Sequence, residues 1–83
     1  MFIGKINIKP KADLLDPAGK AVLASLSNHL QLDAINDVRV GKLVELKVDA
    51  NSIEEAEELV RKAAEQLIVN KVMEDYTFSV EAI

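Results

Sequence analysis

Apolar and polar residues alternate near both ends of the chain, which is the pattern of strands with one buried face. The alternation predicts one strand from Phe2 to Lys9, ended by Pro10, and another from about Asp75 to Ala82. In each segment the apolar side chains share one face. They are Gly4, Ile6 and Ile8 in the first and Tyr76, Phe78, Val80 and Ala82 in the second.

The segment after the first strand has helical spacing. Asp16 can cap free amides and Pro17 suits the first helical position, so a helix is predicted to start there and to end near Leu30. Its apolar positions form one stripe. They are Ala18, Val22, Leu26 and Leu30, with the small polar Ser25 at the same helical spacing.

A second helix is predicted from Ser52 to about Val69. Ser52 and Glu55 have the spacing of a capping box, and Asn70 tolerates the positive φ that often ends a helix. The first turns are acidic, which suits the positive end of the helix dipole. The apolar stripe is continuous: Ala56, Leu59, Val60, Ala63, Ala64, Leu67 and Ile68.

Residues 36–48 have strand character, interrupted at Gly41-Lys42. A two-residue loop there would put Glu45 and Lys47 on the same side as Val40, against the apolar pattern. One extra residue restores agreement. The pattern therefore predicts a hairpin with a bulge or three-residue loop, with Gly41 at positive φ.

The predicted order is β-α-β-β-α-β in a single domain, residues 1–83. We expect an α+β, two-layer sandwich of ferredoxin-like type, in which a four-stranded antiparallel sheet carries both helices on one face. The other face would be mixed and mostly polar. It would present Lys5, Asn7, Arg39, Glu45, Lys47, Thr77, Ser79 and Glu81.

Length and charge narrow the function classes. A chain of 83 residues buries only about 60% of its unfolded surface, so it gains from pairing, and we expect a dimer or tetramer. The net charge of −4 argues against nucleic acid. The alternating start lacks the apolar core of a signal peptide, and no apolar run is long enough for a bilayer, so a cytoplasmic protein without membrane contact is expected.

The residues offer little for catalysis. His29 is the only histidine and there is no cysteine, which argues against a transition-metal site and excludes a thiol nucleophile. The glycines Gly4, Gly19 and Gly41 form no phosphate loop or dinucleotide motif. We therefore expect no catalytic, metal or cofactor-binding residues on this chain.

Three binding roles stay open on the residues alone. An RNA-recognition module would need aromatic residues on the open sheet face, whereas Tyr76 and Phe78 fall on the apolar side. A regulatory module of the ACT type, which senses a small ligand between paired domains, has the same element order. An assembly subunit would need only surfaces.

Four short stretches, in this order and spacing, resemble the PurS family, the small subunits of phosphoribosylformylglycinamidine synthase. They are Asp16–Val22, Val38–Lys42 followed by Glu45-Leu46, Glu54–Ala56, and Asn70–Tyr76. The chain departs from the family at two helix ends. Lys71 stands where proline is common, and Asn28–Leu32 lacks a common glycine.

The resemblance implies a non-catalytic subunit of an ATP-dependent, glutamine-using ligase of purine synthesis. A large synthase subunit would bind ATP, magnesium and formylglycinamide ribonucleotide, and a glutaminase subunit would release ammonia. This chain, as a dimer or tetramer, would join the two and support ammonia transfer. Carried over by position, the expected partner contacts are Asp16, Lys20, Arg39, Gly41 and Lys42, of which Lys20, Arg39 and Lys42 look surplus to folding.

Overall fold

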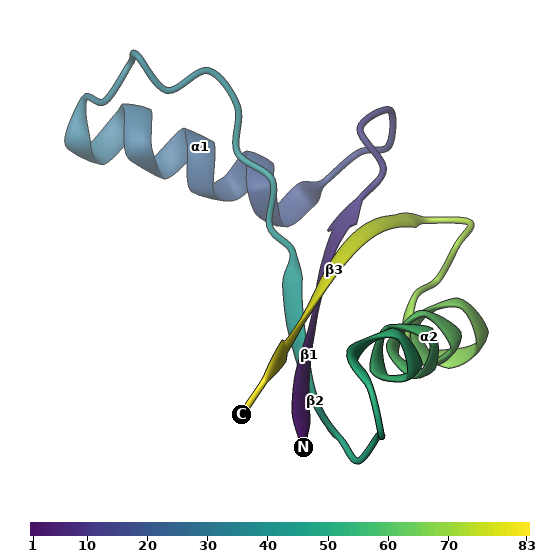
Figure 1. Ribbon diagram of the computed structural model, residues 1–83. Coiled ribbons are helices and arrows are strands. Elements are labelled where there is room, and N and C mark those ends of the chain that lie inside the picture. The colour runs from purple at the N-terminus through teal and green to yellow at the C-terminus, as the bar shows by residue number, and fades with distance from the viewer.

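The computed structural model describes Met1–Ile83 and shows two parts, a body and a projecting arm (Figure 1). The body holds three strands, β1 (Phe2–Pro10), β2 (Lys42–Val48) and β3 (Glu74–Ala82), and the helix α2 (Ile53–Ala63), which runs on into a π-helical turn, η1 (Ala64–Ile68). The arm, residues 17–37, holds α1 (Pro17–Leu30) and the irregular chain after it. Two segments, residues 11–16 and 38–41, connect arm and body, and we call them the neck.

The sheet is antiparallel with the order β2-β1-β3. Ile6 in the central strand β1 pairs with Val44 on one side and Phe78 on the other. Because β1 has a neighbour on each side and a helix over it, Ile6 and Ile8 are the most deeply buried residues of the sheet. The predicted alternation of β1 and β3 is confirmed.

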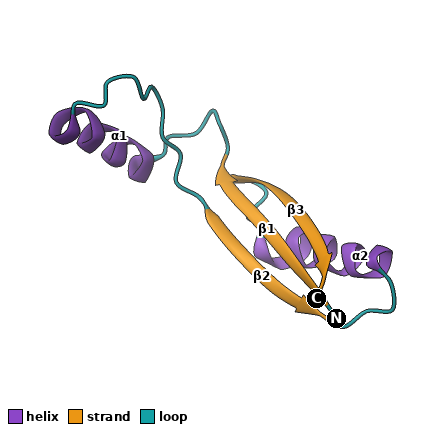
Figure 2. Cartoon of the chain, turned by 60° about the vertical axis from the view of Figure 1, so that its left-hand side comes forward, coloured by secondary structure: helices purple, strands orange, loops and turns teal.

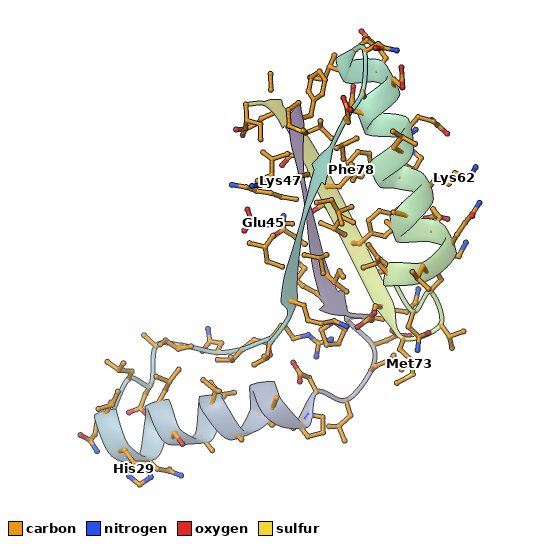
Figure 3. The ribbon with its side chains drawn as sticks, turned by 90° about the horizontal axis from the view of Figure 1, so that it is seen from below. His29, Glu45, Lys47, Lys62, Met73 and Phe78 are labelled. Atoms are coloured by element: carbon orange, nitrogen blue, oxygen red, sulfur yellow. The ribbon has the colours of Figure 1, made fainter.

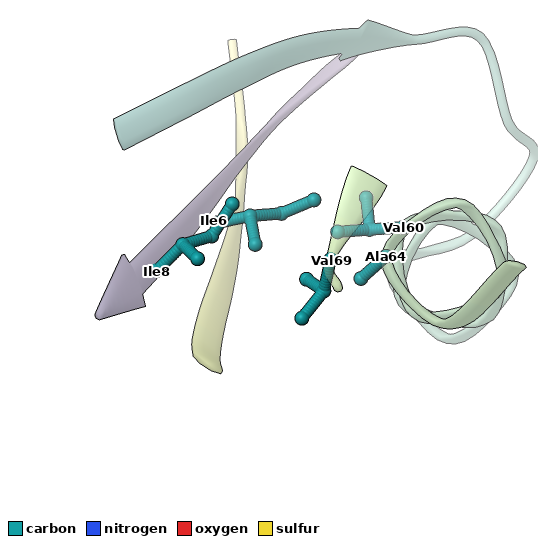
Figure 4. Close-up of a cluster of buried hydrophobic side chains, with 5 residues drawn as sticks. All are labelled: Ile6, Ile8, Val60, Ala64 and Val69. Atoms are coloured by element: carbon teal, nitrogen blue, oxygen red, sulfur yellow. The ribbon is translucent and has the colours of Figure 1, made fainter. Parts of the chain in front are cut away.

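The core lies between one face of this sheet and α2, which crosses it (Figures 2 and 4). Val60 and Ala64 are fully buried against Ile6 and Ile8, as the helical stripe predicts, and Val69 closes the end of the cluster. Strand residues at the margin pack around it. They are Val44, Leu46, Val48, Tyr76, Phe78 and Val80.

The helix starts follow the sequence closely. The Asp16 carboxylate accepts a hydrogen bond from Gly19 N at 3.1 Å, and Ser52 Oγ accepts one from Glu55 N at 3.2 Å. The predicted φ at Asn70 is wrong, because only Gln31 among non-glycine residues has positive φ. The side-chain oxygen of Asn70 instead accepts a hydrogen bond from Val72 N, and this turn leads the chain into β3.

The fourth strand is absent. The sheet has three strands, and residues 36–40 do not pair with any of them. The physical reason is that the backbone of this segment is used in the neck. Val40 N donates to the Asp16 carboxylate, and the carbonyl oxygen of Val38 lies against Gly19.

The predicted hairpin at Gly41 is also wrong. No glycine has positive φ, and β2 pairs only with β1. Gly41 is needed for another reason: a Cβ atom there would lie 2.3 Å from the carbonyl oxygen of Ile8.

Only α2 covers the sheet, so the expectation of both helices on one face is wrong for α1. α1 has no appreciable packing against the strands or α2, and Gly19 is its only buried residue (Figures 1 and 2). The arm projects so far that the molecule measures 51 × 28 × 14 Å. Its radius of gyration is 16.3 Å, whereas a compact chain of this length has about 12 Å.

Candidate functional site

The projecting helix α1 carries an apolar stripe without a partner inside the chain. Val22 and Leu30 are 42% and 61% exposed. Together with Leu26 and neighbouring small residues they line a shallow groove along the helix, with His29 at its far end (Figure 3). The predicted stripe is therefore real, but it faces outward and not onto the sheet.

The neck is held by hydrogen bonds between its two segments. The Asp16 carboxylate accepts from Gly19 N through one oxygen and from Val40 N, at 2.9 Å, through the other. The guanidinium of Arg39 donates to the carbonyl oxygens of Leu14, at 3.2 Å, and Lys11. Each segment thus supplies a side chain that binds the backbone of the other.

The electrostatics of Asp16 follow from these contacts. The hydrogen bond from Val40 N, then that from Gly19 N, lowers the pKa of the Asp16 carboxyl, and the nearby positive charge of Arg39 acts in the same direction. Hydrogen bonds to the charged form have this effect because they are lost on protonation. Asp16 is buried and ionised at neutral pH.

The five residues predicted to contact partners do gather around the neck, but not all are free. Arg39 is engaged with backbone carbonyls, and Lys42 lies 3.2 Å from the Glu74 carboxylate. The interpretation that Arg39 is surplus to folding was wrong, because it binds the backbone of the first neck segment, whereas the exposed Lys42 makes only an ion pair. Lys20 is exposed on the first turn of α1. Partner contact by any of the five stays a prediction.

The sheet face away from α2 is uncovered and mostly polar (Figure 3). Lys5 pairs in register with Glu45 and Ser79, and Lys47 and Glu81 flank Ile3. Tyr76 and Phe78 lie on the opposite, helix-covered side, where Phe78 stacks beneath Arg61. The predicted facing of the sheet is confirmed, except that Arg39 lies in the neck. The open face has no aromatic residues on which bases could stack.

A polar network that the sequence analysis missed joins η1 to β3. Tyr76 Oη donates a hydrogen bond to the Glu65 carboxylate, which also accepts one from Lys71 Nζ at 2.9 Å. The hydrogen bond from Tyr76, then that from Lys71, lowers the pKa of Glu65, and the same bond raises the pKa of Tyr76. The alternation of β3 placed Tyr76 correctly, but no sequence signal paired it with a residue 11 positions earlier.

The groups available for chemistry are few and scattered. No group of three His, Cys, Asp or Glu side chains comes together in a way that could hold a metal ion. Neither helix combines the length and the apolar character needed to span a bilayer. What the geometry does provide is an exposed helical stripe, a hydrogen-bonded neck and an open sheet face.

Known proteins of the same size share this geometry. The PurS subunit of phosphoribosylformylglycinamidine synthase from Bacillus subtilis is 35% identical over 83 residues, which span all of this chain and 96% of that protein. The crystal structure of Methanocaldococcus jannaschii PurS, described as one of the subunits of formylglycinamide ribonucleotide amidotransferase, superposes with a TM-score of 0.87 at 28% identity, covering 100% and 99% of the two chains.

A chain in the structure of PurLQS from Thermotoga maritima superposes with a TM-score of 0.89 at 32% identity, covering 96% of each chain. The arm is therefore part of the shared fold. Residues 4–82 match the family described as PurS, phosphoribosylformylglycinamidine (FGAM) synthase. The chain belongs to the PurS family.

Proposed function

We propose that this chain is a non-catalytic assembly subunit of the glutamine-dependent FGAM synthase of purine biosynthesis, acting in the cytoplasm. The observation that carries the proposal is the family match over residues 4–82, supported by the likeness to a chain of the PurLQS structure. In this role the chain joins a large synthase subunit to a glutaminase subunit. ATP and magnesium belong to the large subunit, and this chain supports the passage of ammonia between the two.

The composition of the chain agrees with that division of work. Without cysteine it cannot supply the thiol of a glutaminase, and its three glycines form no phosphate loop. Its contribution then lies in the exposed surfaces of the arm, the neck and the open sheet face.

The test is reconstitution with the large subunit and the glutaminase subunit from the same organism. We expect the three chains to copurify in the presence of glutamine and nucleotide. Omission of this chain should abolish FGAM formation from glutamine but spare formation from added ammonium, because only the glutamine route needs ammonia to be transferred. Equal loss of both activities would contradict a role in transfer. Failure of the chain to bind either subunit would contradict the assembly role itself.

Self-association as a dimer or tetramer is the second part of the proposal. The accessible surface is 5865 Å², about 1,000 Å² more than the roughly 4,900 Å² of a compact monomer of this mass. That excess is comparable to the roughly 800 Å² that each partner buries in a standard interface. The apolar stripe of α1 lies within the exposed surface, so a second copy is the occupant that we propose for it.

Sedimentation at micromolar concentration tests this point. We expect the wild-type chain to sediment as a dimer or larger, and Val22→Glu, on the stripe, to shift it toward monomer. Leu67→Glu is the matched control, because Leu67 is 86% exposed on η1, away from the stripe. A wild-type monomer, or an unchanged oligomer in Val22→Glu, would overturn the proposal.

A further inference from the structure

Within a single chain, only the neck can fix the direction of the arm. α1 has no appreciable packing against the sheet or α2. The connections at the neck, residues 11–16 and 38–41, contain no regular secondary structure. Connecting segments of this kind are usually more mobile than the helices and strands that they join.

Asp16 does more here than cap a helix. Capping of α1 uses one carboxylate oxygen, which accepts from Gly19 N. The other oxygen accepts from Val40 N, which is 24 residues away on the second segment of the neck. A helix cap needs no such bond, so the second oxygen of Asp16 ties α1 to the segment that leads into β2.

Arg39 closes the neck in the reverse direction. Its guanidinium reaches back to the carbonyl oxygens of Lys11 and Leu14, so that one planar group binds two points of the first segment. A guanidinium holds its donors in a fixed fork, and it therefore restricts rotation more than a single hydrogen bond would.

Gly19 provides the third constraint. A Cβ atom there would lie 2.1 Å from the carbonyl oxygen of Val38, so the first turn of α1 rests directly on the backbone of the second segment. This close approach holds the two segments together at a third point, on the arm side of the bonds made by Asp16 and Arg39.

We propose that Asp16, Gly19 and Arg39 form a lock across the neck that fixes the direction of α1 relative to the sheet. The arm is then presented to its surroundings as a rigid element and not on a tether. This inference concerns the single chain, and it holds or fails independently of the proposed function.

The chain suits a direct distance measurement because it has no cysteine of its own. Asn28→Cys near the far end of α1, outside the groove, and Lys62→Cys on the outer side of α2 would carry one spin label each (Figure 3 labels Lys62). Both positions are exposed. Dilution of labelled chains into an excess of unlabelled chains removes distances between copies. Pulsed electron spin resonance should then give one narrow distance for the otherwise unchanged chain.

We expect Asp16→Asn and Arg39→Gln to replace that narrow peak with a broad distribution, and Arg39→Lys to give an intermediate width. Gly19→Ala should shift the peak, because the new methyl group pushes α1 away from Val38. The matched controls are Asp13→Asn, at an exposed carboxylate within the first segment of the neck, and Arg61→Gln, at the other arginine. Both should keep the narrow peak.

Hydrogen exchange of the β1 and β3 amides shows whether the body stays folded in each variant. A broad distribution in the unchanged chain would overturn the proposal. A peak that stays narrow in both Asp16→Asn and Arg39→Gln would also overturn it. If one variant does not fold, the other and Arg39→Lys still decide the question.

Discussion

Gly4 lies directly beneath Val60, and the two residues fix how closely α2 can approach the sheet. A Cβ atom on Gly4 would lie 2.5 Å from Cγ2 of Val60, and Val60 is fully buried. Valine is stiff at χ1 because its Cβ is branched, so it cannot swing away from the added methyl group. The glycine of the predicted apolar face is therefore a point of close packing.

The first prediction is a double-mutant cycle on this pair. Gly4→Ala should destabilise the chain by about 1–3 kcal/mol through overpacking. Val60→Ala should cost about 2 kcal/mol through the cavity it leaves. The double variant should be more stable than the sum of the two losses implies, because the new methyl group enters the vacated space. Denaturant unfolding measures all four chains, and strict additivity would show that the two residues do not compete for space.

The second prediction concerns Gly41, where the obstacle is backbone. The missing Cβ would meet the carbonyl oxygen of Ile8, so no side-chain substitution can make room. Gly41→Ala should therefore destabilise the start of β2 by about 2 kcal/mol. Lys42→Ala, at the adjacent exposed position, is the control and should cost less. Exchange of the β2 amides locates the loss, and unchanged protection in Gly41→Ala would contradict the prediction.

The third prediction uses the left-handed residue at the end of α1. Gln31 has φ 54°, a conformation that costs a non-glycine residue about 1–2 kcal/mol. Gln31→Gly should stabilise α1 by up to about 1 kcal/mol, after the loss of about 0.5–1 kcal/mol from the greater freedom of glycine in the unfolded chain. Ala24→Gly in the exposed middle of α1 should destabilise it by about 1 kcal/mol. Helical circular dichroism during thermal unfolding should show these opposite effects.

The fourth prediction tests the network of Glu65 and Tyr76. Glu65→Gln removes the charge that Tyr76 faces, so the pKa of Tyr76 should fall toward its usual value of 10.0. Tyr76 is the only tyrosine and there is no tryptophan, so the ultraviolet absorbance of tyrosinate reports this residue alone. Glu55→Gln, at the start of α2, should leave the titration unchanged. An unshifted Tyr76 in Glu65→Gln would show that the two side chains do not interact in solution.

The fifth prediction is the response of the neck to acid. In the folded chain the pKa of Asp16 is lowered from its usual value of 3.8. The contribution of ionised Asp16 to folding stability is therefore complete above pH 3.8, and it is lost as the pH falls through the lower pKa of the folded chain. The protection of the Val40 and Gly19 amides, taken relative to the intrinsic exchange rate at each pH, should therefore fall in this acid window. In Asp16→Asn this protection should already be lower at neutral pH and should fall less in acid. An acid-induced loss of protection as large as that of the unchanged chain would show that Asp16 does not hold the neck.

The body of the fold was predictable because its elements are encoded by local patterns. The alternation in β1 and β3, the cap at Ser52 and the stripe through Val60 each depend on residues close together in sequence. Local rules also placed both ends of α1. The fourth strand failed as a prediction because alternation alone does not say what a strand pairs with.

The candidate site was predictable only as a set of positions. The family resemblance singled out Asp16, Lys20, Arg39, Gly41 and Lys42. It could not say that Asp16 accepts from Val40 or that Arg39 reaches Lys11, because those bonds join residues 24 and 28 positions apart.

The sequence by itself determined where each helix and most strands begin and end, which faces are apolar, and that the chain lacks a thiol and a phosphate loop. These properties depend on side-chain chemistry and on spacing within a few residues. Only the tertiary structure decided that the α1 stripe points away from the sheet and that the neck residues are bound to each other. The direction of a helix relative to a sheet depends on contacts between distant segments, which periodicity does not encode.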